Sequence, residues 1–268
     1  MRTKILLSVL FLVGSLTNIY GQDTLKTDTT KVVIETKRQK TTVSVMGGKL
    51  EKRDSTRNAS SKFSFQLTFA RIDLGLATFL DNGSFTLSPE NAFLENRQWK
   101  TSNFGFEVLQ TGYRFNSYFK IYLAAGIDWN HIRLKQNITI KPEQPVLTHE
   151  PETEVKFSKN RFSSSYLRIP LAFQFRTKDD NKGNKFYFVA GPEVGFLITG
   201  KTKQVSDERG KVKFKDDFNL NPFRYGAFAR IGYNGLGIYA KYYANDVFAD
   251  NQGPKDFKNF NFGVMLGF

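Results

Sequence analysis

Two histidines are the side chains of this sequence best suited to proton transfer, because the pKa of an imidazole ordinarily lies near neutral pH. His131 ends a segment of alternating apolar and polar residues, and His149 lies in the acidic stretch "LTHEPETE". Neither belongs to a nucleophile motif, and the acidic stretch has no second ligand at a spacing that would hold a divalent cation. We therefore predict no catalytic residue, no bound metal and no cofactor. An enzyme that uses one of these histidines is kept as an alternative.

Charged side chains are the other candidate functional residues, since they recur on one face of segments whose other face is apolar. In "SSYLRIPLAFQFRT" (residues 164–177), large apolar residues alternate with Arg168, Gln174 and Arg176. A period of two indicates a β-strand with two unlike faces. Opposite charges that meet on such faces would form ion pairs. The members of this predicted charge network are Arg168, Glu193, Arg230, Lys241, Asp128 and Glu107.

One predicted hairpin joins residues 164–177 to the next alternating segment, residues 185–200, through a turn-forming cluster, "KDDNKG". Pairing of Thr177 with Asn184 makes the two apolar faces coincide. It also predicts that Arg168 lies opposite Glu193 on the polar face.

A second predicted hairpin turns at Asn234 and Gly235, two residues that tolerate positive φ and form the strongest short hairpin signal. This turn places Ile231 opposite Ile238 on the apolar face. On the polar face it places Arg230 opposite Tyr239.

Segments in which apolar and polar residues alternate are predicted as eight strands. A bulge is expected near Ala70 and Arg71, and near Val108 the apolar residues change from one face of the strand to the other. The strands cover residues 63–79, 103–115, 119–130, 164–177, 185–200, 224–233, 236–243 and 259–268. Their connections alternate in length without exception. Long polar connections cover 81–102, 133–163, 201–222 and 245–258, and short ones cover 116–118, 178–183 and 234–235.

Alternation of long and short connections is typical of membrane barrels, which have tight turns at one end and extended loops at the other. A soluble sandwich has no reason to show it. We therefore predict an all-β fold, an eight-stranded antiparallel up-and-down transmembrane β-barrel, with a soluble β-sandwich as the alternative. The basic stretches "KFSKNRF" and "KQVSDERGKVKFK" are expected to extend their strands into external hairpins. Such a cationic rim would suit lipopolysaccharide phosphates or would be an ordinary solvated loop surface.

Aromatic residues make up 15% of the chain and gather at both ends of the apolar faces. Two aromatic belts that flank an apolar band are typical of residues at membrane interfaces. The belt predicted at the short turns contains Phe115, Phe119, Phe175, Phe186, Tyr233 and Phe268. The belt predicted at the long loops contains Phe104, Trp129, Phe196, Phe223, Phe260 and Phe79.

The first 21 residues have the layout of a secretory signal peptide, with Arg2 and Lys4 before a short apolar run and a polar end at Gly21. Residues 22–61 contain no aromatic residue and are expected to form a flexible periplasmic segment, with a small hairpin of "KVVIE" and "TVSVM" as the alternative. The barrel domain is expected to cover residues 62–268. The chain has no cysteine, so thiolate metal sites and disulfides are excluded. Its net charge of +14 becomes +12 without the two basic residues of the signal.

Four stretches resemble the PorT-like outer-membrane β-barrel proteins of Gram-negative bacteria, and the resemblance covers roughly residues 63–268. The stretches are "YLRIPLAFQF", "ARIDLGLATFL", "DDFNLNPFRYGAFARIGY" and "GPKDFKNFNFGVMLGF". Arg168 departs from the pattern, because such proteins more often carry an acidic residue there. The resemblance implies an eight-stranded barrel in the outer membrane, and the namesake is associated with a protein-secretion pathway. The end of the chain is similar to the signal read by the barrel assembly machinery, which here would consist of Phe260, Phe262, Val264, Leu266 and Phe268.

The predicted function is therefore structural or interaction work in the cell envelope without enzymatic activity, with assistance of protein secretion as one form of that work. The alternatives are a narrow solute pore with a cationic lumen and an outer-membrane enzyme. The expected partners are outer-membrane lipid and lipopolysaccharide, the barrel assembly machinery, and secretion or envelope proteins. Nucleic acid is not an expected partner, because an exported basic chain meets anionic lipid instead.

Overall fold

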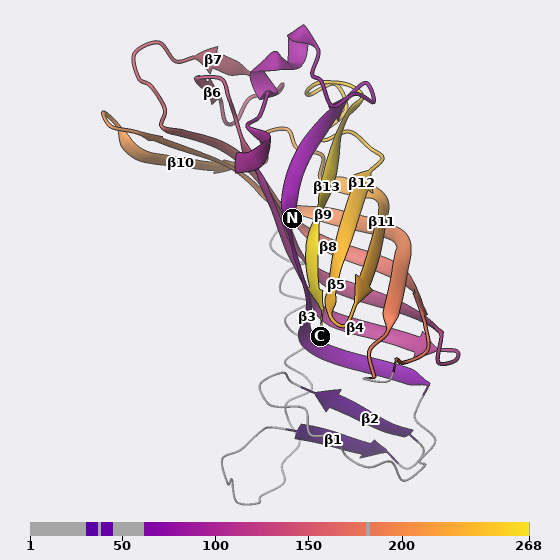
Figure 1. Cartoon of the computed structure of the whole chain (residues 1–268). Helices are drawn as coiled ribbons and strands as arrows, with labels where there is room; N and C mark the ends of the chain where they lie inside the picture. Colours follow the sequence, from indigo (N-terminus) through magenta and orange to yellow (C-terminus); the bar gives the residue numbers. More distant parts are fainter. Residues whose placement is uncertain (1–30, 37–38, 45–61, 181–182, 268) are drawn as a thin grey trace, which may run out of the picture. The chain divides into compact units, whose positions relative to one another are not determined.

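The computed structural model describes residues 31–36, 39–44, 62–180 and 183–267. The predicted signal peptide and Phe268 lie outside the described residues. Within them, eight antiparallel strands close into a ring (Figure 1). These are β3 (Phe63–Asp81), β4 (Ser102–Arg114), β5 (Phe119–Arg133), β8 (Lys159–Arg176), β9 (Phe186–Ser206), β11 (Phe223–Tyr233), β12 (Leu236–Tyr243) and β13 (Phe257–Gly267).

Each strand of the ring pairs with its neighbours along the chain, and the ring closes because β13 pairs with β3. The predicted fold class, an eight-stranded antiparallel up-and-down barrel, is therefore confirmed. Side chains alternate between the two faces of each strand, as the pattern of buried and half-buried residues along β5 shows. The face that carries polar and small residues points inward, and the apolar face points outward.

Two predicted irregularities are confirmed in the pairing of β3, β4 and β5. The register between β3 and β4 shifts between Leu67 and Arg71. The register between β4 and β5 shifts between Glu107 and Leu109. A third shift, at Ser165 and Tyr166 between β8 and β9, was not predicted.

The hairpin at Asn234 and Gly235 is confirmed residue by residue. Ile231 pairs with Ile238, and Arg230 pairs with Tyr239. Both turn residues have positive φ, 47° and 81°, which is the conformation that this sequence favours.

The register predicted for the hairpin of β8 and β9 is wrong by two residues. Thr177 pairs with Phe186 rather than with Asn184, because the Asn184 carbonyl instead accepts a hydrogen bond from the Asp180 backbone N–H at 2.8 Å. Arg168 is therefore opposite Gly195, and Glu193 is opposite Pro170. A shift of two leaves every side chain on its predicted face.

The long connections lie together at one end of the ring and the short ones at the other. The connection after β3 contains two 3-10 helices, η1 (Pro89–Leu94) and η2 (Gln98–Lys100), and the one after β5 contains β6 (Ile138–Ile140) and β7 (His149–Pro151). Strand β10 (Gly210–Asp216) pairs with the far end of β9, which confirms the predicted extension of these strands beyond the ring (Figure 1).

Two further strands lie before the barrel, where a flexible segment was expected and a hairpin was the alternative. Strand β1 (Lys31–Thr36) pairs antiparallel with β2 (Gln39–Ser44), with Val32 opposite Val43. In the described part of the chain, no helix is long and apolar enough to cross a membrane.

Candidate functional site

Arg168 lies at the centre of a buried cluster of charges that fills the middle of the barrel. Its Nη1 is 2.7 Å from the Asp73 Oδ2, and its Nη2 is 2.7 Å from the Glu107 Oε1. Its Nε is 3.6 Å from the Glu193 Oε2. The guanidinium is thus shared among carboxylates from β3, β4 and β9, and its Nη1 also lies 4.0 Å from the Asp128 Oδ1 of β5.

Two further basic side chains join the same carboxylates. The Arg230 Nη2 is 2.8 Å from the Glu107 Oε1. The Lys241 Nζ lies 2.8 Å from the Asp73 Oδ2 and 2.8 Å from the Asp128 Oδ1. Strands β11 and β12 are therefore tied to β3, β4 and β5 through the interior as well as through the sheet.

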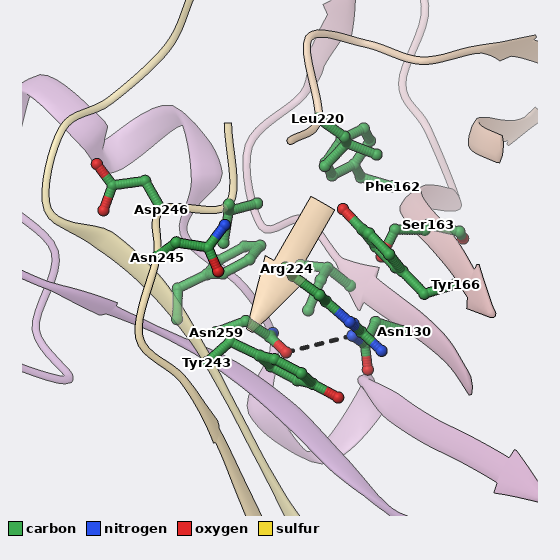
Figure 2. A pocket seen from close by; sticks show the side chains of 14 residues that line it. Asn130, Phe162, Ser163, Tyr166, Leu220, Arg224, Tyr243, Asn245, Asp246 and Asn259 are labelled. Carbon is green, nitrogen blue, oxygen red and sulfur yellow. Dashed lines mark hydrogen bonds between the residues drawn. The ribbon is translucent and has the colours of Figure 1, made fainter. Parts of the chain in front are cut away.

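Arg224 is held between two aromatic rings at the side of the cluster nearest the long connections (Figure 2). Its guanidinium carbon is 3.9 Å from the ring centroid of Tyr166 and 4.0 Å from that of Tyr243. The Arg224 Nη2 donates to the Asp128 Oδ2 at 2.7 Å. Stacking and a charge-assisted hydrogen bond together fix the orientation of this side chain.

The fully buried charges of the cluster are matched in number. Four buried basic residues, Arg168, Arg224, Arg230 and Lys241, meet four buried acidic residues, Asp73, Glu107, Asp128 and Glu193. A fifth basic residue, the partly exposed Arg71, joins at the edge, where its Nη1 lies 3.2 Å from the Glu107 Oε2, so the formal charges sum to +1. A buried charge without a partner is strongly destabilising, most of all in a membrane. This pairing of nearly equal numbers of opposite charges explains how a barrel interior can hold this many charged groups.

Amide and hydroxyl groups extend the cluster by hydrogen bonds to its carboxylates and to one another. The Tyr239 hydroxyl donates to the Asn103 Oδ1 at 2.7 Å, and the Asn103 amide donates to the Asp128 Oδ1 at 3.0 Å. Gly75 makes room for Tyr239, because a Cβ at position 75 would collide with the tyrosine hydroxyl. The glycine on the inner face of β3 is thus required by the large side chain of Tyr239 on β12.

An apolar layer and a mixed layer close the interior on the two sides of the charge cluster. Toward the long connections, residues of the loops pack onto residues of the strands: Ala77, Phe79, Leu94, Ile132, Leu134, Ile138, Ile140, Phe162, Phe218, Leu220, Phe248 and Phe257. Toward the short turns lies a smaller apolar group: Tyr122, Ala124, Ala172, Val189 and Phe228. The polar residues Gln110, Lys120 and Gln174 are buried beside this smaller group, so the interior is filled in three layers, apolar, charged and mixed.

A small cavity lies between the charge cluster and the apolar layer beneath the long connections (Figure 2). Its volume is about 30 Å³, which holds a water molecule or two but no larger solute. Arg224, Tyr166 and Tyr243 line it on one side, and the Asn130 amide donates to the Asn259 Oδ1 across it at 3.2 Å. The cavity has no room for a solute path.

The structure places the residues predicted for the charge network together. Arg168, Glu193, Arg230, Lys241, Asp128 and Glu107 are all buried in the one cluster. Asp73 and Arg224 belong to the same cluster. The tyrosines and Asn103 were not named as members of the network, although their inward positions follow from the same period of two.

The aromatic residues of the two predicted belts that the structure describes lie on the outer face, with one exception. Rings of adjacent strands contact one another at each end, as Phe119 and Phe175 do at a centroid distance of 4.9 Å and Phe104 and Trp129 at 5.5 Å. The belt residues that are exposed or half-exposed are Phe115, Phe119, Phe175, Phe186, Tyr233, Phe104, Trp129, Phe196, Phe223 and Phe260. Phe79 is the exception and the prediction for it is wrong: it is 3% exposed, because it pairs with the inward-facing Asn259.

The two histidines do not form a recognisable catalytic site. The ring of His149 stacks on Phe93 at a centroid distance of 4.0 Å. His131 lies on the outer face opposite Ser163, and its Nδ1 has no hydrogen-bond partner among the described residues. Nor do the described residues contain a group of three or more His, Cys, Asp or Glu side chains that could hold a metal ion.

A family model described as "Outer membrane protein beta-barrel domain" matches residues 42–245. Among solved structures, the crystal structure of Ail, the attachment invasion locus protein of Yersinia pestis, is similar to this chain. The identity is 14%, the TM-score is 0.30, and the alignment covers 76% of this chain and 95% of that one. No curated protein matches the sequence.

Proposed function

Because the chain belongs to the family of outer membrane protein β-barrel domains, we propose that it is a structural and interaction protein of the cell envelope whose barrel does not conduct solutes. The observation that carries this proposal is the ion-paired cluster around Arg168, which fills the barrel at mid-height. An ion that entered would have to displace paired charges from one another. The apolar layer beneath the long connections adds a second barrier.

The long connections are the surface through which such a barrel would bind partners. In membrane barrels the long loops face outward from the cell and the short turns face the periplasm. Two large side chains are exposed in the connection between β3 and β4: Trp99, which is 89% exposed, and Phe85, which is 55% exposed. Exposed aromatic side chains are frequent anchors in protein interfaces.

Finer assignments belong to the same proposal. Cleavage of a signal peptide after Gly21 is supported by the layout of residues 1–21. Delivery by the barrel assembly machinery is supported by the outward row of Phe260, Phe262, Val264 and Leu266 on the last strand. A part in protein secretion, with envelope proteins as partners, is supported by the resemblance to PorT-like proteins in "YLRIPLAFQF".

Conductance across a planar bilayer tests the proposal against the alternative of a narrow cationic pore. We expect no discrete current steps from the purified chain at any voltage that the bilayer tolerates. Insertion would be verified in the same preparation by heat-modifiable migration on gels, so that an absent current is not mistaken for an absent barrel. Anion-selective steps from the inserted chain would contradict the proposal and favour the pore.

A further inference from the structure

Four basic side chains stand directly opposite one another across four adjacent strands, beyond the aromatic belt at the long-loop end. Arg133 of β5 pairs with Arg161 of β8, Arg161 pairs with Lys203 of β9, and Lys203 pairs with Lys213 of β10. We refer to these four residues as the cation row. Further basic residues flank it on the same strands: Lys159, Lys201, Lys211 and Lys215.

The cation row lies on the outward face of the sheet. Along β5, Trp129, His131 and Arg133 alternate with the buried residues Asn130 and Ile132. Arg133 is four residues beyond Trp129, or about 13 Å along a strand and about 10 Å along the membrane normal for a typical barrel tilt. Since aromatic belts mark the membrane interface, the cation row stands at the level of lipid headgroups or just above them.

The protein itself leaves the charge of the cation row uncompensated. Like charges directly opposite each other destabilise a sheet. None of the four side chains makes an ion pair with an acidic side chain among the described residues. The acidic residues of the neighbouring loop pair elsewhere, Glu150 with Lys141 at 2.5 Å and Glu152 with Arg209 at 2.8 Å.

The basic residues also repel one another. Repulsion by Lys211 and Lys201 lowers the pKa of Lys213 below its ordinary value. An anion bound at the row would relieve this repulsion.

We propose that the cation row binds the phosphate groups of a phosphorylated glycolipid in the outer leaflet, with its acyl chains against the apolar outer face of β5, β8 and β9. Arginine offers a planar fork of donors that matches a phosphate, and lysine adds point charge. A row of four cations at one level suits a headgroup that carries more than one phosphate. The inference rests on the proposed function only in placing the long-loop end at the outer leaflet.

Binding to the full chain in detergent tests this site. Isothermal titration would use three probes: bisphosphorylated lipid A, the same lipid with its phosphates removed, and inorganic pyrophosphate. The double variant Arg161→Gln/Lys203→Gln removes the centre of the cation row. The matched control, Arg114→Gln/Lys178→Gln, removes one exposed arginine and one exposed lysine at the short-turn end.

We expect the double variant to bind bisphosphorylated lipid A about 25-fold more weakly, a factor of about five for each basic residue lost at an anionic surface. The control should bind it as the wild type does, and the dephosphorylated lipid should bind weakly to all three proteins. Unchanged lipid A binding by the double variant, or equal binding of the dephosphorylated lipid, would overturn the site. Pyrophosphate binding as tight as that of lipid A would overturn the assignment to a lipid.

Heat-modifiable migration of both variants shows whether the barrel has folded, so a loss of binding cannot be an unfolding effect. A chain that binds no lipid A yet gives no conductance would overturn this inference and leave the proposed function standing. A chain that conducts ions and still binds lipid A through Arg161 and Lys203 would overturn the proposed function and leave this inference standing.

Discussion

The Nη1 of Arg168 lies 2.7 Å from the Oδ2 of Asp73, although 95 positions separate the two residues in the sequence. Strands β8 and β3 are not neighbours, since β4 and β5 stand between them in the ring. The ion pair therefore crosses the interior of the barrel. It shows that the charges hold opposite walls together, and do not merely line a passage.

Replacing Arg168 by methionine should lower the free energy of unfolding by about 3–5 kcal/mol, because Asp73 and Glu107 would keep buried charges without their main partner. Equilibrium unfolding by urea in detergent micelles measures the loss. Arg209→Met is the matched control, since Arg209 pairs with Glu152 at an exposed position, where an ion pair contributes at most about 1 kcal/mol. Equal losses in the two variants would contradict a stabilising cluster.

Glu193→Ala should lower the midpoint of heat-modifiable migration, because it removes a carboxylate that serves both Arg168 and the Tyr243 hydroxyl. Tyr243→Phe removes only the hydrogen bond, which is 2.5 Å long, and should cause a smaller decrease. Gel migration of unheated and stepwise heated samples gives both midpoints. If Glu193→Ala leaves the midpoint unchanged, the carboxylate does not support Arg168.

Gly235→Ala should destabilise the barrel more than Gly210→Ala. Both glycines have positive φ, 81° and 63°, so alanine pays about 1–2 kcal/mol of backbone strain at either position. A Cβ at position 235 would also stand 2.5 Å from the Gly267 carbonyl oxygen, whereas one at position 210 meets nothing within 4 Å. Urea unfolding compares the two variants, and equal losses would show that the end of β13 moves aside freely.

The fold and the membership of the charge cluster were predictable from the period of two, because the face of a residue depends only on its parity along the strand. Arg168 and Glu193 illustrate this point: the register between their strands was wrong by two residues, yet both side chains meet in the interior. Their distances were not predictable. An arginine that reaches across the lumen to Asp73 depends on the curvature of the ring, which a single strand does not encode.

Phe79 shows where the pattern failed. An aromatic residue near the end of a strand fits an interfacial belt and an interior layer equally well by type. The structure places Phe79 inside, at a ring-centroid distance of 4.7 Å from Phe257, in the layer completed by loop residues such as Phe218 and Phe248. Loop packing of this kind has no periodic signal in the sequence.

Quenching of tryptophan fluorescence by brominated lipid tests the central claim most directly, which is that the bulky face of these strands contacts acyl chains. The test compares Phe262→Trp, at an outward position that is 43% exposed, with Phe228→Trp, at an inward position that is 3% exposed. Both are made in a background in which Trp99 and Trp129, the two native tryptophans, are replaced by phenylalanine. We expect brominated lipid to quench the tryptophan at position 262 strongly and the one at position 228 weakly. Equal quenching, or stronger quenching at position 228, would contradict the account.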